Sequence, residues 1–153
     1  LCLSVPLRFH VSGAEKENHL EEGVRDMTVV ITLAFILFIV VVIAYLFPLA
    51  VVYGNSMLPT YHEGEILLCR RVLIKKLHNY HDGDVYVCKA PYSDEEVRLI
   101  IKRVSFIVED GAKQKYLYLL GDNPPESHDS RQYGVVHCNS VVAKVLFKIK
   151  SKG

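Results

Sequence analysis

The order of hydrophobic and polar residues divides the chain into two parts. Between Val29 and Tyr53, 23 of 25 residues are hydrophobic, and the stretch contains no Asp, Glu, Lys or Arg. A helix of about 20 apolar residues crosses the hydrocarbon core of a bilayer, whereas the apolar core of a secretory leader has only about 7–15 residues. The pattern therefore predicts one transmembrane helix over residues 28–52, which Pro48 bends or ends near its C-terminal side.

Residues 1–27 precede this helix, and we assign them no function. Basic residues stand on both sides of the apolar run in similar numbers. The positive-inside rule, by which an excess of Lys and Arg marks the cytoplasmic side, therefore gives no orientation.

After the apolar run, the pattern changes to short hydrophobic stretches separated by turn residues such as Asp82-Gly83-Asp84. Hydrophobic and polar positions alternate within several of them, which is typical of half-buried strands. The expected strands are Ile66–Val72, Val85–Lys89, Val97–Phe106, Tyr116–Leu120 and Val141–Ile149. No amphipathic helix of 10–15 residues is expected here. The pattern predicts a mainly β domain, a sandwich or a barrel, over residues 53–153.

The net charge and the spacing of cysteines and histidines bear on whether the chain binds nucleic acid or metal ions. The 153 residues carry a formal net charge of +1, so nucleic acid is not an expected partner. The four cysteines and seven histidines show none of the spacings typical of metal ligands, and we expect no metal site. For Cys69, Cys88 and Cys138 two states stay open. They are buried free thiols, which we favour, or Cys69 and Cys88 form a disulfide between neighbouring strands.

Two residues suggest a catalytic pair. Ser56 follows Gly54-Asn55, a dipeptide that permits unusual backbone angles and a close approach by another chain. Lys102 lies in an otherwise apolar stretch, and if its side chain points inward, burial lowers its pKa. A neutral lysine can take the proton from a serine hydroxyl, which is weakly nucleophilic alone. The polar loop at residues 121–134 is suited to orienting such groups.

Three motifs, in their order and spacing, resemble the signal peptidase I (leader peptidase) family. They are Ser56-Met57-x-Pro59-Thr60, then Lys102-Arg103-Val104, then Gly121-Asp122-Asn123-x-x-x-Ser127-x-Asp129-Ser130-Arg131. The resemblance covers about residues 53–150. It implies a mostly β catalytic domain with an apolar surface on the membrane, and a serine endopeptidase that needs no metal or organic cofactor.

The resemblance also implies a role for each matched residue. Ser56 matches the nucleophile, which forms an acyl-enzyme, and Lys102 matches the general base. Ser127 matches a hydroxyl that hydrogen-bonds and orients the lysine. The remaining matched residues shape the site or hold its loop, with Asp129 and Arg131 expected as an ion pair: Met57, Pro59, Asp122, Asn123, Asp129, Ser130 and Arg131.

One position departs from many bacterial members of this family. Two residues before the nucleophile they carry a hydroxyl that helps to stabilise the oxyanion, whereas this chain has Gly54. Mitochondrial inner membrane proteases also have glycine there, and the compact maturation proteases of nickel-type superoxide dismutase are similar in both loops. The resemblance is therefore compatible with activity.

The sequence thus predicts a membrane-anchored serine endopeptidase that removes N-terminal signal or pro-peptides from precursor proteins. Membrane lipid is the second expected partner, and a partner subunit stays open. The catalytic domain faces outward from a plasma membrane, or faces the intermembrane space from the mitochondrial inner membrane. Two alternatives remain: a dedicated maturation peptidase for one precursor, as for nickel superoxide dismutase, or a catalytically inactive peptide-binding partner subunit.

Overall fold

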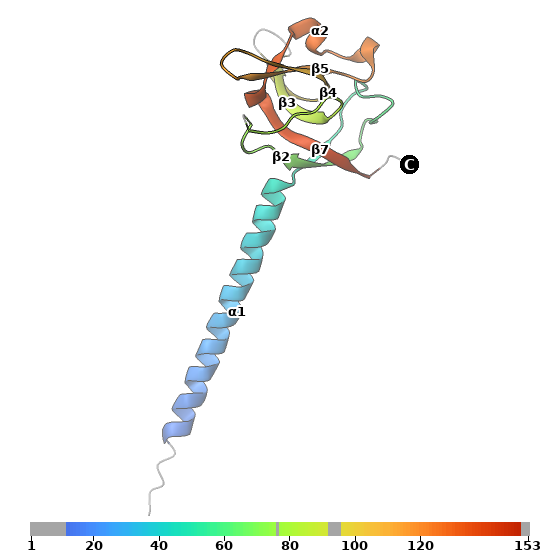
Figure 1. The fold of residues 1–153 in the computed structure, drawn as a ribbon. Helices are drawn as coiled ribbons and strands as arrows, with labels where there is room; N and C mark the ends of the chain where they lie inside the picture. Colours follow the sequence, from blue (N-terminus) through green and yellow to red (C-terminus); the bar gives the residue numbers. More distant parts are fainter. Residues whose placement is uncertain (1–11, 76, 92–95, 151–153) are drawn as a thin grey trace, which may run out of the picture. The chain divides into compact units, whose positions relative to one another are not determined.

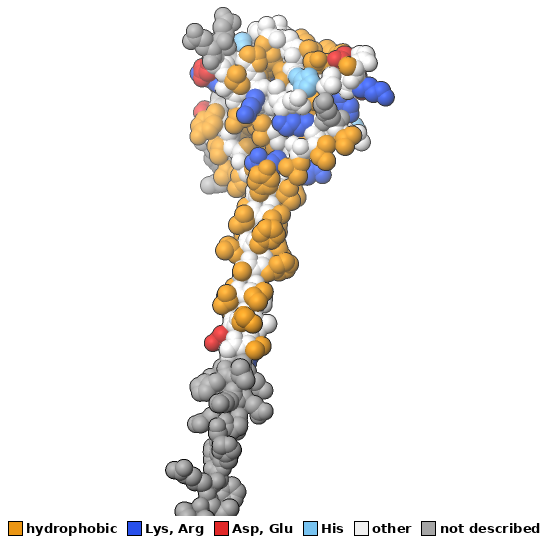
Figure 2. Space-filling view, turned by 90° about the vertical axis from the view of Figure 1, so that its left-hand side faces the viewer, with side chains coloured by type: hydrophobic (Ala, Val, Ile, Leu, Met, Phe, Trp, Pro, Cys, Tyr) orange, Lys and Arg blue, Asp and Glu red, His pale blue; other side chains and the backbone are white. Residues whose placement is uncertain are grey.

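The computed structural model describes residues 12–75, 77–91 and 96–150, and the chain forms two compact units that divide between Ile43 and Ala44. Helix α1 (Ser12–Leu46) contains a segment, Gly23–Leu46, that is long and apolar enough to cross a membrane. The most apolar stretch of this segment has no buried residue, and Figure 2 shows hydrophobic side chains over the described helix surface. A helix that is apolar on all faces needs either a protein core or a bilayer around it. By length and composition, Gly23–Leu46 is suited to a bilayer.

The helix is shorter at its C-terminal end than the predicted residues 28–52. It ends at Leu46, and Leu49–Val51 instead forms strand β1. Pro48 explains the difference, because proline lacks the backbone N–H that a helix needs and disfavours helical geometry in the residue before it. The last apolar residues of the run therefore belong to the sheet of the second unit.

An antiparallel sheet of seven strands forms most of the described part of the second unit, in the order β1-β2-β7-β3-β4-β5-β6. Figure 1 shows this β unit, with β2, β3, β4, β5 and β7 labelled. The further strands are β2 (Ile66–Arg71), β3 (Val85–Pro91), β4 (Val97–Glu109), β5 (Lys115–Leu120), β6 (Val136–His137) and β7 (Val141–Lys150). The short helices are η1 (Pro124–Glu126), α2 (Ser130–Tyr133) and η2 (Cys138–Ser140). The prediction of a mainly β domain behind one apolar helix is confirmed.

All five predicted strands are present, with ends that differ by a few residues. Two strands were not predicted. The three residues of β1 lie inside the apolar run, where a strand cannot be told from a helix by periodicity. The two residues of β6 are too few to show any period.

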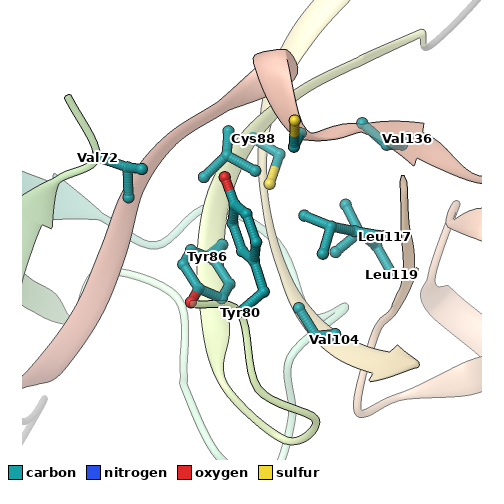
Figure 3. Packing of buried hydrophobic residues seen from close by; sticks show 10 residues of the cluster. Val72, Tyr80, Tyr86, Cys88, Val104, Leu117, Leu119 and Val136 are labelled. Atoms are coloured by element: carbon teal, nitrogen blue, oxygen red, sulfur yellow. The ribbon is translucent and has the colours of Figure 1, made fainter. Parts of the chain in front are cut away.

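Buried side chains form two hydrophobic clusters in this domain. The first surrounds Tyr86 and Leu117, which are fully buried on β3 and β5 (Figure 3). The second contains Leu67 from β2 and Met57, which follows β1 closely in the chain. Met57 therefore anchors the segment that contains Ser56 in the core.

The cysteines of the described chain lie in these clusters as thiols. Cys69, Cys88 and Cys138 are free and buried, so the disulfide between Cys69 and Cys88 is absent and the alternative of buried thiols is the one observed. Burial raises the pKa of the Cys69 thiol to about 11 and that of Cys88 to about 12. Since the thiolate is the reactive form, neither cysteine is a candidate nucleophile near neutral pH.

Candidate active site

Ser56 and Lys102 meet at the start of the turn that follows β1. The Nζ atom of Lys102 lies 2.6 Å from the Ser56 Oγ atom, and 46 residues separate the two in the chain. The turn begins at Gly54, whose positive φ of 73° favours glycine over residues with a side chain. Lys102 comes from β4 and is only 4% exposed. The sheet therefore brings a hydroxyl and a buried amine into direct contact.

Burial sets the protonation of Lys102. It lowers the pKa of the ammonium group from 10.5 to about 8, because water no longer solvates the charge. Asp129 acts in the opposite direction and raises this pKa, while Arg131 lowers it. With a pKa of about 8, roughly a tenth of the lysine is neutral at pH 7. In that form the nitrogen lone pair can accept the proton of the Ser56 hydroxyl.

The loop after β5 packs against the backbone of Ser56. Asn123 N–H donates to the Ser56 carbonyl oxygen at 3.0 Å, and the Asn123 side-chain amide donates to the Asn55 carbonyl at 3.1 Å. Asn55 in turn donates from its side chain to Glu126, at 2.9 Å. These three bonds hold Ser56 against the loop through the peptide groups on both of its sides. The roles of Asn55 and Glu126 were not predicted, since neither forms a recognisable motif by itself.

Gly121 allows this close packing. A Cβ atom built at this position would lie 2.1 Å from the Ser127 Oγ atom and 2.5 Å from the Ser56 carbonyl oxygen. Both distances are shorter than real contacts of a Cβ atom, so only glycine fits between Ser56 and Ser127. The sequence signal was the first residue of the Gly-Asp-Asn motif, to which no role was assigned.

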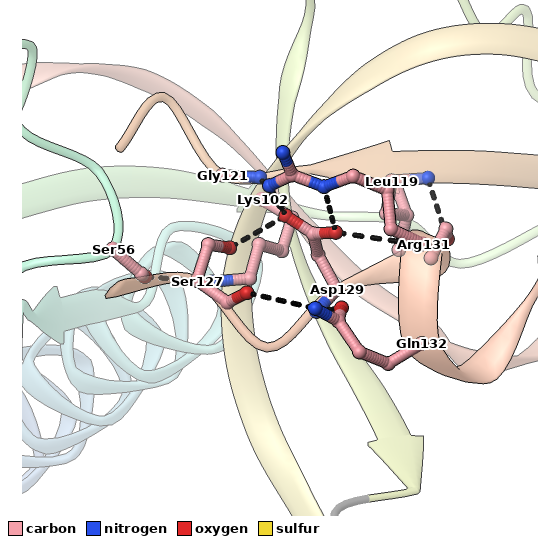
Figure 4. A network of polar contacts seen from close by, with 9 residues as sticks. Ser56, Lys102, Leu119, Gly121, Ser127, Asp129, Arg131 and Gln132 are labelled. Carbon is pink, nitrogen blue, oxygen red and sulfur yellow. Dashed lines mark hydrogen bonds and ion pairs between the residues drawn. The ribbon is translucent and has the colours of Figure 1, made fainter. Parts of the chain in front are cut away.

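Asp129 is the centre of the polar network drawn in Figure 4. Its carboxylate is fully buried and accepts hydrogen bonds from the Ser127 hydroxyl at 2.6 Å, from Gly121 N–H at 2.9 Å and from the Arg131 guanidinium at 2.6 and 2.9 Å. Burial alone would raise its pKa, but the bonds from Arg131, Ser127 and the backbone outweigh it and hold the pKa well below its usual range. Asp129 is therefore a stable anion that ties the loop together.

Two further residues complete this loop. Asp129 caps helix α2, and the Gln132 side chain closes the capping box by accepting from the Asp129 N–H. Ser130 is buried, and its hydroxyl accepts from the Leu119 N–H at 2.9 Å. The loop is thus fixed to β5 through Ser130 as well as through Gly121.

Ser127 is 5% exposed and lies beside Gly121. Its hydroxyl donates to Asp129, and within the described residues no hydrogen bond joins it to Lys102. A hydroxyl that donates once keeps two lone pairs. Ser127 can therefore accept from an ammonium group while Asp129 fixes the direction of its proton.

Asp122 connects three segments of the site through Arg103. The Arg103 guanidinium binds the Asp122 carboxylate with two bonds of 2.6 and 2.8 Å and also donates to the Gly83 carbonyl at 2.7 Å. The Thr60 hydroxyl donates to the same carboxylate at 2.5 Å. The bond from Arg103 is the main reason that the pKa of Asp122 is lowered. Thr60 and Arg103 are in the quoted motifs, but their partnership with Asp122 was not predicted.

Of the two matched residues Met57 and Pro59, only Met57 lines the pocket beside Ser56. Met57 is 1% exposed and lines the pocket next to Ser56. Pro59 is exposed, follows a cis peptide bond and does not line that pocket. Pro59 therefore does not form part of the wall of this pocket.

The pocket beside the two central residues has a volume of about 440 Å³. Ser56 and Lys102 line it together with β1, Leu99–Ile101 of β4 and mostly apolar side chains of the strands between them. Its two sides are formed by β1 and by residues 97–102 of β4. Each of these segments has one edge with no hydrogen-bonded neighbouring strand in the described chain. Strand β1 pairs only with β2, and β5 pairs with β4 only from Arg103 onward. The pocket is therefore bordered by two rows of backbone groups that can bind an extended peptide.

Comparison with known proteins adds the family. A search of the curated proteins finds no significant match. The family model described as signal peptidase, peptidase S26, matches residues 24–107 and 106–150, which is most of the chain. The match includes the apolar helix segment, the turn with Ser56, the strand with Lys102 and the loop with Asp129. The chain belongs to the signal peptidase family, peptidase S26, and is a signal-peptidase-like serine peptidase.

Proposed function

We propose that this chain is a membrane-anchored endopeptidase that cleaves N-terminal signal or pro-peptides from precursor proteins, with Ser56 as nucleophile and Lys102 as general base. The observation that carries the proposal is the 2.6 Å contact between the Ser56 hydroxyl and a buried lysine. Its family membership supports the substrate class, since signal peptidases act on precursors that carry signal peptides. The long apolar helix supports the anchor.

The proton steps follow from the pair. Neutral Lys102 takes the proton from Ser56 Oγ while this oxygen attacks the scissile carbonyl carbon. The ammonium group then gives that proton to the leaving amine as the peptide C–N bond breaks, which leaves an ester on Ser56. In the second half, neutral Lys102 takes a proton from water, the hydroxide attacks the ester, and the proton returns to Ser56 Oγ as the ester breaks.

The developing oxyanion needs hydrogen-bond donors. Among the described residues, the Ser56 N–H has no hydrogen-bond partner, so it is available to the carbonyl oxygen of the substrate. Gly54 cannot contribute a hydroxyl. Its positive φ also means that serine or threonine at this position would be strained.

The substrate would bind as an additional strand. A peptide lying between β1 and residues 97–102 of β4 can form backbone hydrogen bonds with either edge. Its alternate side chains would point into the apolar pocket. Only nine residues lie between Leu46 and Ser56. A chain of that length keeps the nucleophile within about 36 Å of the end of the anchor.

The proposal is tested by replacing the nucleophile. Full-length chain in phospholipid vesicles is incubated with precursors that carry N-terminal signal peptides, and new N-termini are identified by mass spectrometry. We expect one defined cut with the wild type and a loss of at least about 1,000-fold with Ser56→Ala. Ser105→Ala, an exposed serine on the lysine's strand, is the matched control and should cut normally.

Two outcomes would contradict the proposal. Cleavage that persists in Ser56→Ala means that another nucleophile acts or that a contaminant is present. Binding of the precursors without any cleavage by the wild type favours the inactive peptide-binding subunit. A single precursor cut among many would support the dedicated maturation peptidase.

The role of Ser127 can be tested separately. If its hydroxyl orients Lys102, then Ser127→Ala should lower kcat by about 10-fold or more while KM changes little. Steady-state kinetics on one precursor peptide give both constants. A loss of thermal stability at unchanged kcat would show instead that Ser127 serves only the fold of the loop around Asp129.

A further inference from the structure

Arg71 lies in the pocket that holds Ser56 and Lys102. It is the last residue of β2, and the side chains of this strand alternate so that Leu67, Cys69 and Arg71 share one face while exposed Arg70 lies on the other. Cys69 and Arg71 both line the pocket. Apart from Lys102, Arg71 is the only charged residue among those that line it.

The sheet register places Arg71 across the pocket floor from β4. Arg71 pairs with Ala143 of β7, Ala143 with Val87 of β3, and Val87 with Ile101 of β4. Residues directly opposite one another share a face of the sheet. The row spans four strands, or about 14 Å in a flat sheet. The two residues in the middle of the row, Ala143 and Val87, have small side chains. They leave open space in the pocket between Arg71 and Ile101.

The guanidinium of Arg71 has no carboxylate partner within the described residues. Its Nε donates to the Tyr45 carbonyl oxygen at 3.1 Å, and its central carbon lies 4.4 Å from the centre of the Tyr45 ring. A guanidinium has five N–H donors, so four remain for another group. By contrast, Arg103 and Arg131 are each bound to a carboxylate of this domain. Arg71 is therefore a half-buried cation in a mostly apolar pocket, with donors that can bind an anion.

We propose that Arg71 binds a carboxylate side chain of the substrate peptide, so that cleavage favours precursors with Asp or Glu at one position that faces the pocket. The inference rests on the proposed function, because it places the peptide along β1 and β4. Only alternate residues of an extended peptide face the pocket, so the preference belongs to that set. Guanidinium and carboxylate can form two parallel N–H···O bonds, which gives the contact direction as well as charge.

A lipid phosphate is the other anion that a membrane-bound chain could offer to Arg71. The observations favour the peptide, because Arg71 shares one continuous pocket with Ser56 and Lys102. Arg70, which is the more exposed of the two neighbouring arginines, is better placed for a headgroup. The two sources can be separated, since only a substrate carboxylate makes the effect depend on peptide sequence.

The experiment scans one residue along the substrate. Full-length chain in uncharged phosphatidylcholine vesicles is given peptides that differ at a single position, with Asp, Asn or Lys placed in turn at each residue upstream of the cut. Cleavage is measured with the wild type, and binding of the same uncut peptides is measured with Ser56→Ala. At one position we expect Asp to exceed Asn by about 10-fold or more in both assays, the size of a charge-assisted hydrogen bond.

Changes at Arg71 should alter this ratio in a defined way. Arg71→Gln should bring the Asp-to-Asn ratio close to 1, and Arg71→Glu should make Lys the preferred residue at the same position. Arg70→Gln, the neighbouring arginine on the opposite face, is the control and should keep the wild-type ratio. Each variant is compared across peptides, so a general loss of activity does not affect the conclusion.

Three results would decide against the inference. Asp and Asn peptides could be cut equally at every position, or the preference could survive Arg71→Gln. In a parallel series with phosphatidylglycerol added to the vesicles, Arg71→Gln could also weaken cleavage of all peptides alike, with no such effect in phosphatidylcholine alone, which would assign Arg71 to lipid. If no peptide is cut but Ser56→Ala binds Asp peptides through Arg71, the inference stands and the proposed function fails.

Discussion

Lys102→Met is expected to abolish peptide cleavage while leaving the fold intact. Methionine has nearly the length of lysine and suits a buried site, but it cannot take a proton from Ser56. General base catalysis contributes about 100- to 10,000-fold, and we expect a loss of kcat/KM in that range. The measurement is the rate of precursor cleavage by the full-length chain in vesicles. Lys89→Met, on the exposed side of neighbouring β3, is the matched control and should leave the rate unchanged.

The same lysine predicts the pH dependence of the wild type. Since its pKa is lowered to about 8 and the neutral form is the proposed base, kcat/KM should rise as pH increases from 6 and level off above about 8. Lys102→Arg should be inactive across this range, because arginine keeps its proton. A rate that rises near pH 6.5 and is lost in His128→Ala would contradict the Ser56–Lys102 pair and indicate a histidine base.

Lys102→Met should also change stability, in the opposite direction to activity. Below pH 8 the folded wild type holds a buried ammonium, and the lowering of the pKa from 10.5 to about 8 corresponds to roughly 3 kcal/mol of unfavourable charging. The variant should therefore unfold at a higher temperature than the wild type at pH 6, as followed by circular dichroism. This advantage should shrink as pH rises from about 8 to 10.5, where the folded wild type loses its proton before the unfolded chain does. A variant that is less stable at pH 6 would show that Lys102 is needed for the fold itself.

The local sequence carried enough information for most of the strands but not for the pocket. Alternation in the segments of β3 and β5 follows from one buried and one less buried face, and this made the mainly β fold predictable. The contact between Ser56 and Lys102 was anticipated because the resemblance supplied the pairing of two segments 46 residues apart. Periodicity alone says nothing about such distances.

Other features depend on packing between distant segments and left no local signal. Strand β1 exists because Pro48 ends the helix and β2 offers a free edge to Leu49–Val51. Arg71 stands beside Arg70 in the sequence, and only the register of β2 and β7 decides which of the two enters the pocket. Thr60 and Arg103 could be read as turn and strand residues until the fold brought both to Asp122.

Gly121→Ala is expected to be the most damaging single-methyl change near the site. The added carbon would lie 2.5 Å from the Ser56 carbonyl oxygen and 2.1 Å from Ser127 Oγ, so the backbone at Ser56 must move. Overpacking of this kind costs about 1–3 kcal/mol of stability. A displacement of about 1 Å at reacting atoms can lower a rate by about 100-fold. We expect a fall in melting temperature together with a loss of at least that size in kcat/KM.

The cause of the loss can be separated from a general effect of alanine in a turn. Gly111→Ala is the matched control, because this glycine has no atom within 4 Å of a new Cβ and no positive φ, and it should behave as the wild type. Ser127→Ala added to Gly121→Ala removes the contact with Oγ but keeps those with the Ser127 Cβ atom at 2.6 Å and the Ser56 carbonyl oxygen at 2.5 Å, so it should not restore the melting temperature. Restoration of the melting temperature to that of Ser127→Ala would mean that the Ser127 hydroxyl, and not the backbone of Ser56, receives the strain. Wild-type kinetics in Gly121→Ala would contradict the close packing of the loop on Ser56, because no rearrangement that accommodates the methyl group leaves both neighbours in place.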